Sequence, residues 1–271
     1  MPRSSGKNMK GKFPYADILA EQDPELLAGF AKGLAVIEVF DEQNQKLTIS
    51  QVSERIGLER ATARRCLLTL TRLGYADYDG KFYTLTPRML RLGYAYLSST
   101  PFINIVQPFL EELSQKTGES CAVAKLDGNE IVYLARASNA SRIMTVSRNV
   151  GGRLPAYGAS LARVILAAWP ADEARALLES AERPKLTPNT IVGIDDLMDE
   201  LVRVGQQGYS INDQETAIGL RSIAVPLVNG TGKVIAGLNI GAQANQVSIE
   251  KMVSFLPDMQ AVQLRLRQLI G

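Results

Sequence analysis

The stretch LERATARRCLLTLTRLGYADYDGKFYTLTP, residues 58–87, constrains the fold of this chain more than any other segment. Its first half forms a helix-prone run in which arginines and leucines separate to opposite sides at helical spacing: Arg60, Arg64 and Arg65 against Leu67, Leu70 and Leu73. Its second half alternates aromatic and polar residues around Asp79-Gly80, a pair that favours a tight hairpin turn. A one-sided basic helix joined directly to a hairpin predicts a small module with a cationic face.

Two more helices are predicted before this one. Residues 24–40 place apolar side chains at helical spacing, with Pro24 in the first turn: Leu27, Phe30, Leu34, Ile37 and Phe40. Residues 48–57 form a short helix that Thr48 or Ser50 caps and Gly57 ends. The third helix then covers about 59–73 and stops at Gly74. Three short helices followed by a hairpin are typical of a winged helix-turn-helix, whose third helix lies in the major groove of DNA.

The side chains of the third helix and of the hairpin suggest a division of roles on DNA. Arg60 and Arg64 are the candidates for reading bases, because a guanidinium can bond guanine with two hydrogen bonds. Four other residues are better placed for phosphates, which supply affinity rather than sequence choice: Thr62, Arg65, Lys81 and Tyr83. The alternative is that these arginines only solvate a surface helix, and the order of helix, turn and hairpin favours the DNA interpretation over it.

Charge is distributed unevenly along the 271 residues, a length that suits about two domains. Residues 44–91 hold nine Lys and Arg against four acidic residues, a net charge of +5, whereas residues 101–271 hold sixteen bases against seventeen acids. A basic small module beside a neutral larger one suits a nucleic-acid reader joined to a domain with another task.

The larger part of the chain, residues 101–271, alternates strand pairs with helices and predicts a sheet covered by helices. A helix over 102–118 precedes a hairpin that turns at Asp127-Gly128, a strand at 141–147, and a Gly/Pro loop at 150–158. Helices are expected near 159–169, 171–181 and 193–206, then a strand at 208–213, a hairpin over 222–242 and a closing helix interrupted at Pro257. The expected class is α+β, with a disordered tail at 1–23, a winged helix-turn-helix at 24–85, a linker helix at 86–100 and an α/β domain at 101–271.

Composition excludes several classes of protein. The chain has no histidine, which removes Ser-His-Asp and Cys-His nucleophiles and His-based zinc sites. Cys66 and Cys121 both lie in apolar segments, so a disulfide framework is not expected and a reducing cytoplasm fits. No apolar run is long enough to cross a membrane, and the basic start lacks the apolar core of a secretion signal. We therefore expect no cofactor, no metal and no membrane partner.

Three stretches resemble the IclR family of bacterial transcription regulators. Residues 48–99 resemble the DNA-binding region of that family, while GGRLPAYGASLARVILAA and GYSINDQETAIGLRSIAVPLVNGTGKVIAGLNIG resemble the two signature regions of its effector-binding domain. Within the family, GLAVIEVF, LERATARRCLLTL and YLSSTP are most similar to the branch that controls aromatic-acid catabolism, the protocatechuate and p-hydroxybenzoate regulators. The resemblance implies a GAF-like effector domain, dimers through the DNA-binding and linker regions, and often tetramers.

The resemblance also implies an effector pocket. Ser160 and Leu161 stand where the family often has Gly-Ala, so their backbone amides would face the effector. Asn212 stands where an aspartate is common, Leu220 matches the family, Ser222 replaces the usual cysteine, and Asn239 and Gly241 replace serines of glyoxylate-responsive members. These departures argue against a small keto acid, and losing the acidic group at 212 removes repulsion toward a carboxylate ligand.

A carboxylate ligand needs a charged partner, for which arginine is efficient. The candidate arginines are Arg136, Arg142, Arg153 and Arg163. Structural pairing is an equal alternative for Arg153 and Arg163. Tyr133 and Tyr157 could stack on an aromatic ring or bond to it, but core positions are the alternative for both.

These observations predict an effector-responsive transcription regulator rather than an enzyme, located in the bacterial cytoplasm at the nucleoid. The expected partners are double-stranded operator DNA, a small aromatic carboxylate, a second copy in a homodimer or tetramer, and RNA polymerase if the protein is an activator. Regulators of this branch commonly activate transcription when their inducer binds, so we expect an activator of p-hydroxybenzoate or protocatechuate catabolic genes. Two alternatives to this activator are a repressor of the same type of pathway that responds to a different carboxylate, and a metabolic enzyme with an accessory DNA-binding module.

Overall fold

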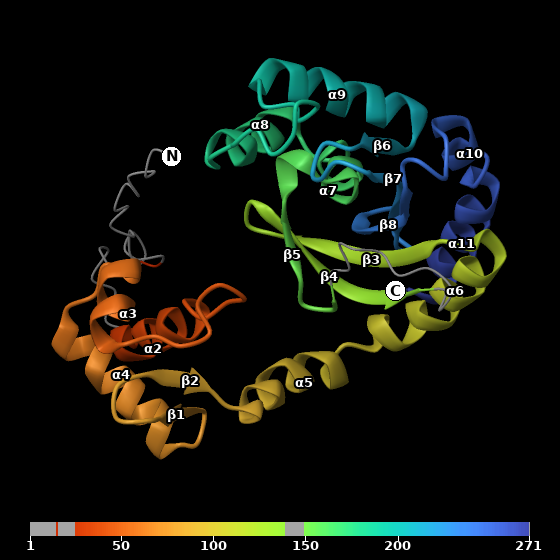
Figure 1. Cartoon of the computed structure of the whole chain (residues 1–271). Coiled ribbons are helices and arrows are strands. Elements are labelled where there is room, and N and C mark those ends of the chain that lie inside the picture. The colour runs from red at the N-terminus through yellow and green to blue at the C-terminus, as the bar shows by residue number, and fades with distance from the viewer. Residues whose placement is uncertain (1–14, 16–24, 139–148, 271) are drawn as a thin grey trace. The chain divides into compact units, whose positions relative to one another are not determined.

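A computed structural model describes residue 15, residues 25–138 and residues 149–270 (Figure 1). The chain divides into two compact units, residues 1–99 and residues 100–271. Pro24, the strand expected at 141–147 and Arg142 lie outside the described residues.

Within the first unit, residues 25–85 form the predicted helices and then a two-stranded hairpin, in the predicted order: α2 (Ala28–Glu38), α3 (Ile49–Ile56), α4 (Arg60–Arg72), β1 (Ala76–Tyr78) and β2 (Tyr83–Leu85). Thr48 begins α3 with a complete capping box, in which its hydroxyl accepts from the Gln51 N–H and the Gln51 side chain accepts from the Thr48 N–H. Gly57 ends α3 in the left-handed conformation, at φ 65°. The predicted helix-turn-helix is confirmed.

The hairpin is held by its own turn residues and by a third segment. The Asp79 carboxylate accepts hydrogen bonds from the N–H groups of Lys81 and Phe82, at 2.9 and 2.7 Å. Leu47 pairs with Tyr83 as an isolated antiparallel bridge and is itself buried. The hairpin is therefore attached to the segment that leads into α3.

Three of the apolar residues that helical spacing placed together are exposed: Leu27 by 78%, Phe30 by 69% and Leu73 by 55%. Ala35 and Val36 of α2 are fully buried instead. Helical spacing defines a stripe of apolar residues, but the packing of α2 against α4 decides which edge of that stripe is covered. The core consists of residues from α2, α3, α4, both strands of the hairpin and the segment before α3: Ala35, Val36, Leu47, Val52, Ile56, Ala63, Leu67, Leu70, Ala76 and Tyr83.

The segment expected to link the units is a short 3-10 turn, η1 (Pro87–Met89), followed by the helix α5 (Leu90–Ser99). None of the side chains of α5 is buried. Four large apolar side chains on it are exposed, namely Leu90, Leu92, Tyr94 and Tyr96.

The second unit is built on a six-stranded sheet in which every pairing is antiparallel, with strand order β5-β4-β3-β8-β7-β6. The strands are β3 (Ser120–Asp127), β4 (Glu130–Ala137), β5 (Arg153–Pro155), β6 (Ser210–Asp213), β7 (Leu220–Val228) and β8 (Val234–Gln243). The expectation of a loop over residues 150–158 is therefore partly wrong. Residues 153–155 pair with β4 as the edge strand β5, and the chain then continues into a 3-10 turn, η2 (Ala156–Gly158).

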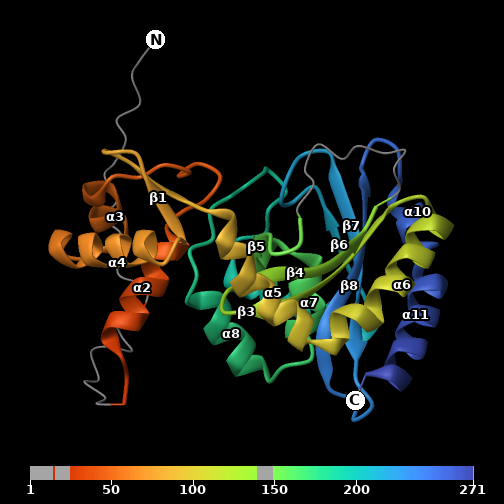
Figure 2. The ribbon, with the colours of Figure 1, turned by 90° about the horizontal axis from the view of Figure 1, so that it is seen from below.

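Helices cover both faces of this sheet (Figure 2). One face carries α6 (Pro101–Thr117), α10 (Ile249–Val253) and α11 (Leu256–Leu269), and the other carries α7 (Ser160–Leu166), with α8 (Ala171–Glu179) and α9 (Ile194–Gln207) packed around it. The closing helix breaks at Ser254-Phe255, before Pro257, which lies in the first turn of α11.

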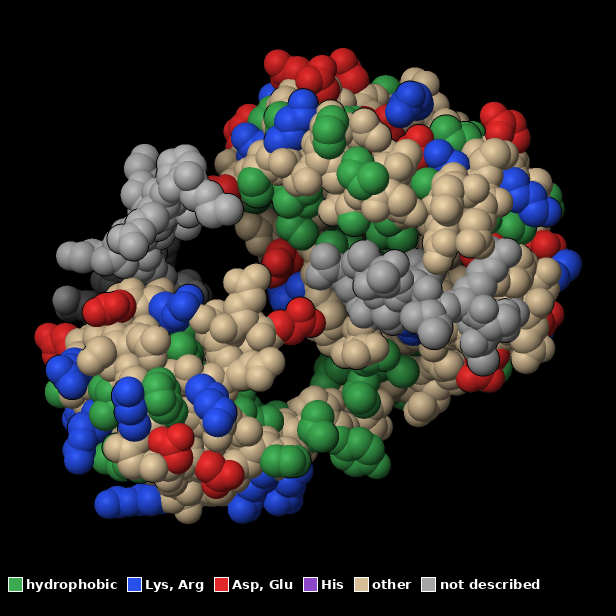
Figure 3. All heavy atoms as spheres, in the orientation of Figure 1, with side chains coloured by type: hydrophobic (Ala, Val, Ile, Leu, Met, Phe, Trp, Pro, Cys, Tyr) green, Lys and Arg blue, Asp and Glu red, His purple; other side chains and the backbone are tan. Residues whose placement is uncertain are grey.

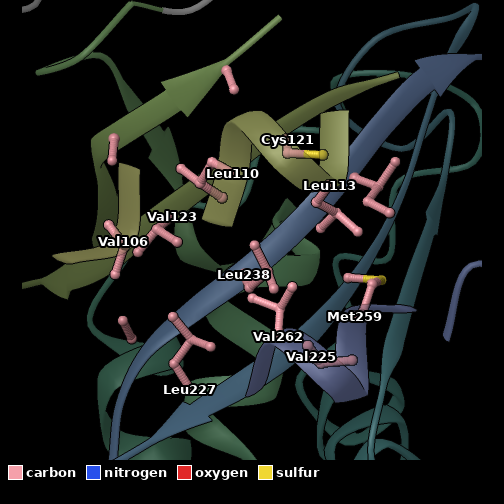
Figure 4. Close-up of a cluster of buried hydrophobic side chains, with 14 of the residues drawn as sticks. Val106, Leu110, Leu113, Cys121, Val123, Val225, Leu227, Leu238, Met259 and Val262 are labelled. Carbon is pink, nitrogen blue, oxygen red and sulfur yellow. The ribbon is translucent and has the colours of Figure 1, made fainter. Parts of the chain in front are cut away.

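Alternation along the strands gives each face its own core. Cys121 and Val123 of β3 join Leu238 of β8 and Val225 of β7 under α6 and α11 (Figure 4). The intervening residues face α7 instead, among them Ala122 and Ala124. The α+β class is confirmed, and the α7 face is the one on which small and polar residues gather.

Glycine is required where α7 approaches the sheet. A Cβ added to Gly237 would lie 2.9 Å from the carbonyl oxygen of Leu161, closer than such atoms approach in folded proteins. The absent side chain lets the first turn of α7 rest directly on β8.

Candidate functional site

The first candidate site is the exposed side of α4 together with the hairpin tip. Arg60, Arg64 and Arg65 are exposed on α4, and Lys81 is exposed at the tip. Figure 3 shows Lys and Arg side chains gathered on the surface of the first unit. The cationic face required for DNA therefore exists on the element that a helix-turn-helix presents to the major groove.

Two of the predicted DNA-contacting residues are placed differently from the others. Thr62 is half-buried, and its hydroxyl accepts a hydrogen bond from Arg65 at 3.5 Å, on the side of α4 that faces α2. Tyr83 is only 2% exposed and stacks on Tyr78 with ring centroids 4.5 Å apart. The expectation that Tyr83 meets a phosphate is corrected, because alternation along β2 turns its ring into the core and leaves Tyr78 as the exposed aromatic of the hairpin.

The second candidate site is a pocket on the α7 face of the sheet in the second unit. Its floor is formed by three neighbouring strands, through Ala122 of β3, Asn239 and Gly241 of β8, and Ser222 of β7. The start of α7 covers it, and the connection between β6 and β7 closes one side. The residues that line it are Ser120, Cys121, Ala122, Tyr133, Arg136, Leu154, Gly158, Ala159, Ser160, Leu161, Asn212, Thr216, Leu220, Ser222, Asn239 and Gly241.

The free volume of this pocket is about 50 Å³. One water molecule needs about 10–15 Å³ by the same measure, so the space accommodates a few waters. Seating a six-membered ring therefore requires some of the lining side chains to move.

Polar groups converge on the pocket from different elements. The hydroxyls of Ser160 and Ser222 lie 2.9 Å apart. Asn212 donates its amide N–H to the carbonyl of Gly158 and accepts from the Glu215 N–H at 3.2 Å. Asn239 is 8% exposed and lines the pocket on β8. A buried amide in the lining of a cavity is the arrangement expected of a ligand-binding group.

Among the residues that the sequence indicated for the effector, eight line this pocket: Arg136, Ser160, Leu161, Asn212, Leu220, Ser222, Asn239 and Gly241. Two others do not. Arg153 forms exposed ion pairs with Glu130 and Asp127, at 2.6 and 2.7 Å. Tyr157 is buried, and its hydroxyl donates to the Pro184 carbonyl at 2.8 Å.

The remaining candidates separate in the same way. Tyr133 lines the pocket, and Arg163 does not. Arg163 is 2% exposed and pairs with Glu215, which matches the structural alternative for this arginine. The pocket lining also includes Thr216, which the sequence did not indicate. The thiol of Cys121 belongs to the core under α6 and α11, and burial there raises its pKa to about 12.

Other kinds of site are not seen in the described parts of the chain. Within residues 25–138 and 149–270, no group of three metal-binding side chains comes together. None of the helices described is long and apolar enough to cross a membrane.

Comparison with known proteins identifies both units. Residues 30–80 match the IclR helix-turn-helix domain, and residues 94–266 match the family described as bacterial transcriptional regulator IclR C-terminal. The Pca regulon regulatory protein of Pseudomonas putida is 41% identical over 251 residues, which cover 92% of this chain and 86% of that protein. The p-hydroxybenzoate hydroxylase transcriptional activator of Acinetobacter baylyi is 35% identical, over 91% of this chain and 93% of that protein.

A solved structure with a bound aromatic acid is also similar. It is an IclR homolog from Microbacterium hydrocarbonoxydans complexed with 4-hydroxybenzoate, with a TM-score of 0.70 and 26% identity. The match covers 89% of this chain and all of that one.

Proposed function

The chain belongs to the IclR family of bacterial transcriptional regulators, and on that premise we propose that it activates aromatic-acid catabolic genes when a monocyclic aromatic carboxylate binds in the pocket of its second unit. It is a DNA-binding regulator related to the regulators of protocatechuate and p-hydroxybenzoate metabolism. Family membership excludes the alternative of a metabolic enzyme.

DNA binding is carried by the helix-turn-helix of the first unit. We propose that Arg60 and Arg64 read bases, with Arg65 and Lys81 contacting phosphates. The support is the exposure of all four side chains, three on α4 and one at the hairpin tip.

The observation that carries the effector proposal is the buried Asn239 amide, which faces the pocket beside the Ser160 and Ser222 hydroxyls. These three groups supply donors for a carboxylate or a ring hydroxyl. Tyr133, Leu154 and Leu220 supply apolar lining for a ring, and Arg136 supplies positive charge at the pocket. We propose p-hydroxybenzoate as the first inducer to test, and protocatechuate or a ring-cleavage product as the second.

Assembly into a homodimer or tetramer is part of the proposal. The four exposed apolar side chains of α5, namely Leu90, Leu92, Tyr94 and Tyr96, form an apolar surface on a helix that buries none of its residues. Surfaces of this kind mark protein interfaces. A dimer would present two recognition helices to the two halves of one operator.

The effector can act only if it binds one arrangement of the DNA-binding heads more tightly than another. The coupling between pocket and DNA is then reciprocal, so operator DNA must change the affinity for the effector by the same factor.

The experiment that tests this proposal uses the full-length protein. Selection from random duplexes identifies its operator, and calorimetric titration with p-hydroxybenzoate, protocatechuate and benzoate is run with and without that operator. We expect saturable binding of a hydroxylated benzoate and a change of affinity when operator is present. Failure of every acid to bind would refute the effector class. Transcription from the operator with RNA polymerase then decides between activation and the repressor alternative.

A further inference from the structure

Glu215 is a buried carboxylate that the sequence did not single out. It lies in the connection between β6 and β7 and is 6% exposed. Its two oxygens accept hydrogen bonds from the two terminal nitrogens of Arg163, at 2.8 and 2.6 Å. Arg163 lies on α7, is 2% exposed, and donates a further hydrogen bond to the Tyr157 carbonyl at 3.1 Å. This two-point pairing fixes the position of Glu215 relative to α7.

A second carboxylate lies near Arg163 and pairs in turn with an exposed arginine. Glu200 of α9 lies 3.8 Å from Arg163 and pairs with Arg203, which is exposed. Burying such ions costs desolvation free energy that their attraction recovers only with good geometry, and an apolar replacement is often as stable. A gain in stability therefore does not explain why these charged side chains are buried. The segment of the chain that they hold in place can explain it.

The pair holds a turn whose backbone is strained. Gln214 has φ 62°, the only positive φ of a non-glycine residue in the described chain. Such a conformation costs free energy and persists only where neighbouring groups determine it. The Thr187 hydroxyl donates to the Gln214 carbonyl at 2.8 Å, and the Thr190 hydroxyl donates to the Glu215 carbonyl at 2.6 Å.

The turn is also a wall of the pocket. Thr216 and Leu220 both line the cavity. The Thr216 methyl group packs against Gly158, where an added Cβ would lie 3.2 Å from it. Asn212 joins the same two segments, because it bonds to the Gly158 carbonyl and to the Glu215 N–H.

We propose that Glu215, held by Arg163, is a positioning residue of the effector pocket, which sets the 214–219 turn so that Thr216 and Leu220 form its wall. Asn212 then acts by joining the turn to Gly158 and does not need to touch the ligand. This inference rests on the proposed function for the identity of the ligand, while the positioning itself is a property of the ligand-free protein.

The primary test is Glu215→Gln in the full-length protein. The substitution retains size, removes the charge that compensates Arg163, and replaces one acceptor with a donor facing the guanidinium. We expect a lower Tm and at least tenfold weaker binding of p-hydroxybenzoate at a temperature where the variant is folded. Binding of operator DNA is expected to be retained.

A matched control removes a different partly buried carboxylate from an ion pair on the other face of the sheet. Asp258, in the first turn of α11, lies 2.6 Å from Lys116 of α6. Asp258→Asn should lower the Tm while leaving the affinity for p-hydroxybenzoate within about twofold. Loss of stability by itself is thereby separated from loss of positioning.

A double variant, Arg163→Met with Glu215→Leu, tests the same distinction by restoring stability without restoring the hydrogen bonds that set the turn. Apolar residues of similar size should return the Tm toward that of the natural protein. The affinity should remain low, because the hydrogen bonds that set the turn are absent. Recovery of both the Tm and the affinity would overturn the inference.

Hydrogen exchange provides a readout that needs no ligand. The amides of residues 214–220 should exchange faster in Glu215→Gln than in the natural protein or in Asp258→Asn, while those of β8 do not change. Unaltered exchange together with unaltered affinity would refute the positioning role. If the natural protein binds none of the acids, the proposed function fails, and the exchange comparison still decides this inference.

Discussion

The hydroxyl oxygens of Ser160 and Ser222 lie 2.9 Å apart, across the pocket from α7 to β7. They are 62 positions apart in the sequence. One hydroxyl donates to the other, so the hydrogen of the acceptor remains available to point into the cavity. The pair thus joins the pocket cover to its floor and presents a donor to a ligand.

Replacing Ser222 by Ala should weaken binding of p-hydroxybenzoate by about twofold to twelvefold, since one hydrogen bond contributes roughly 0.5–1.5 kcal/mol. Isothermal titration of the full-length protein measures this. Ser180→Ala is the control, because the Ser180 hydroxyl donates to the Leu177 carbonyl at the end of α8 and is not part of the pocket lining. Equal affinities of the Ser222 variant and the natural protein would show that this hydroxyl does not serve the ligand.

Replacing Arg64 by Ala should weaken operator binding by about 1–3 kcal/mol and relax sequence preference at one base pair. Lys81→Ala provides the contrast, since loss of a phosphate contact weakens all duplexes alike and lowers the salt slope by about one. Fluorescence anisotropy with operator and random duplexes distinguishes the two. A uniform loss for Arg64→Ala would assign this arginine to phosphates.

Replacing Gly237 by Ala should destabilise the second unit by about 1–3 kcal/mol, as expected when a methyl group is forced into a packed core. The added Cβ meets the Leu161 carbonyl oxygen at 2.9 Å and pushes α7 away from β8. Gly230→Ala is the matched control, because its Cβ would meet ordinary contacts at 3.8 and 3.9 Å. Urea unfolding of both variants tests the difference, and equal midpoints would contradict it.

The hairpin of the first unit should loosen in acid. Hydrogen bonds from the N–H groups of Phe82 and Lys81 hold the pKa of Asp79 below its ordinary value of 3.8. A carboxyl whose pKa is lowered by folding stabilises the fold fully above 3.8 and loses that effect as the pH falls through its folded pKa. The amides of Lys81 and Phe82 should therefore be protected from exchange at pH 7 and less so near pH 3. Asp79→Asn should show weak protection at both pH values, and a persistent pH effect in that variant would assign it to another group.

The first unit was largely predictable because its signals are local. Thr48 with Gln51, Gly57 and the Asp79-Gly80 turn determine where α3 and the hairpin begin and end, whatever lies around them. The errors at Leu73 and Tyr83 concern burial, which depends on neighbours from other elements. A periodic pattern gives the direction of a side chain but not the surface that covers it.

The sequence by itself determined the order of the elements, the cationic side of α4 and, through family resemblance, seven residues of the pocket. Only the tertiary structure decided that Arg153 and Arg163 serve ion pairs, and that Glu215, Thr187 and Thr190 hold the turn beside Thr216. The physical reason is distance along the chain. Capping and turn preferences act within a few residues, whereas the pocket joins side chains from β3, β4, β6, β7, β8 and α7, which approach one another only when the sheet forms.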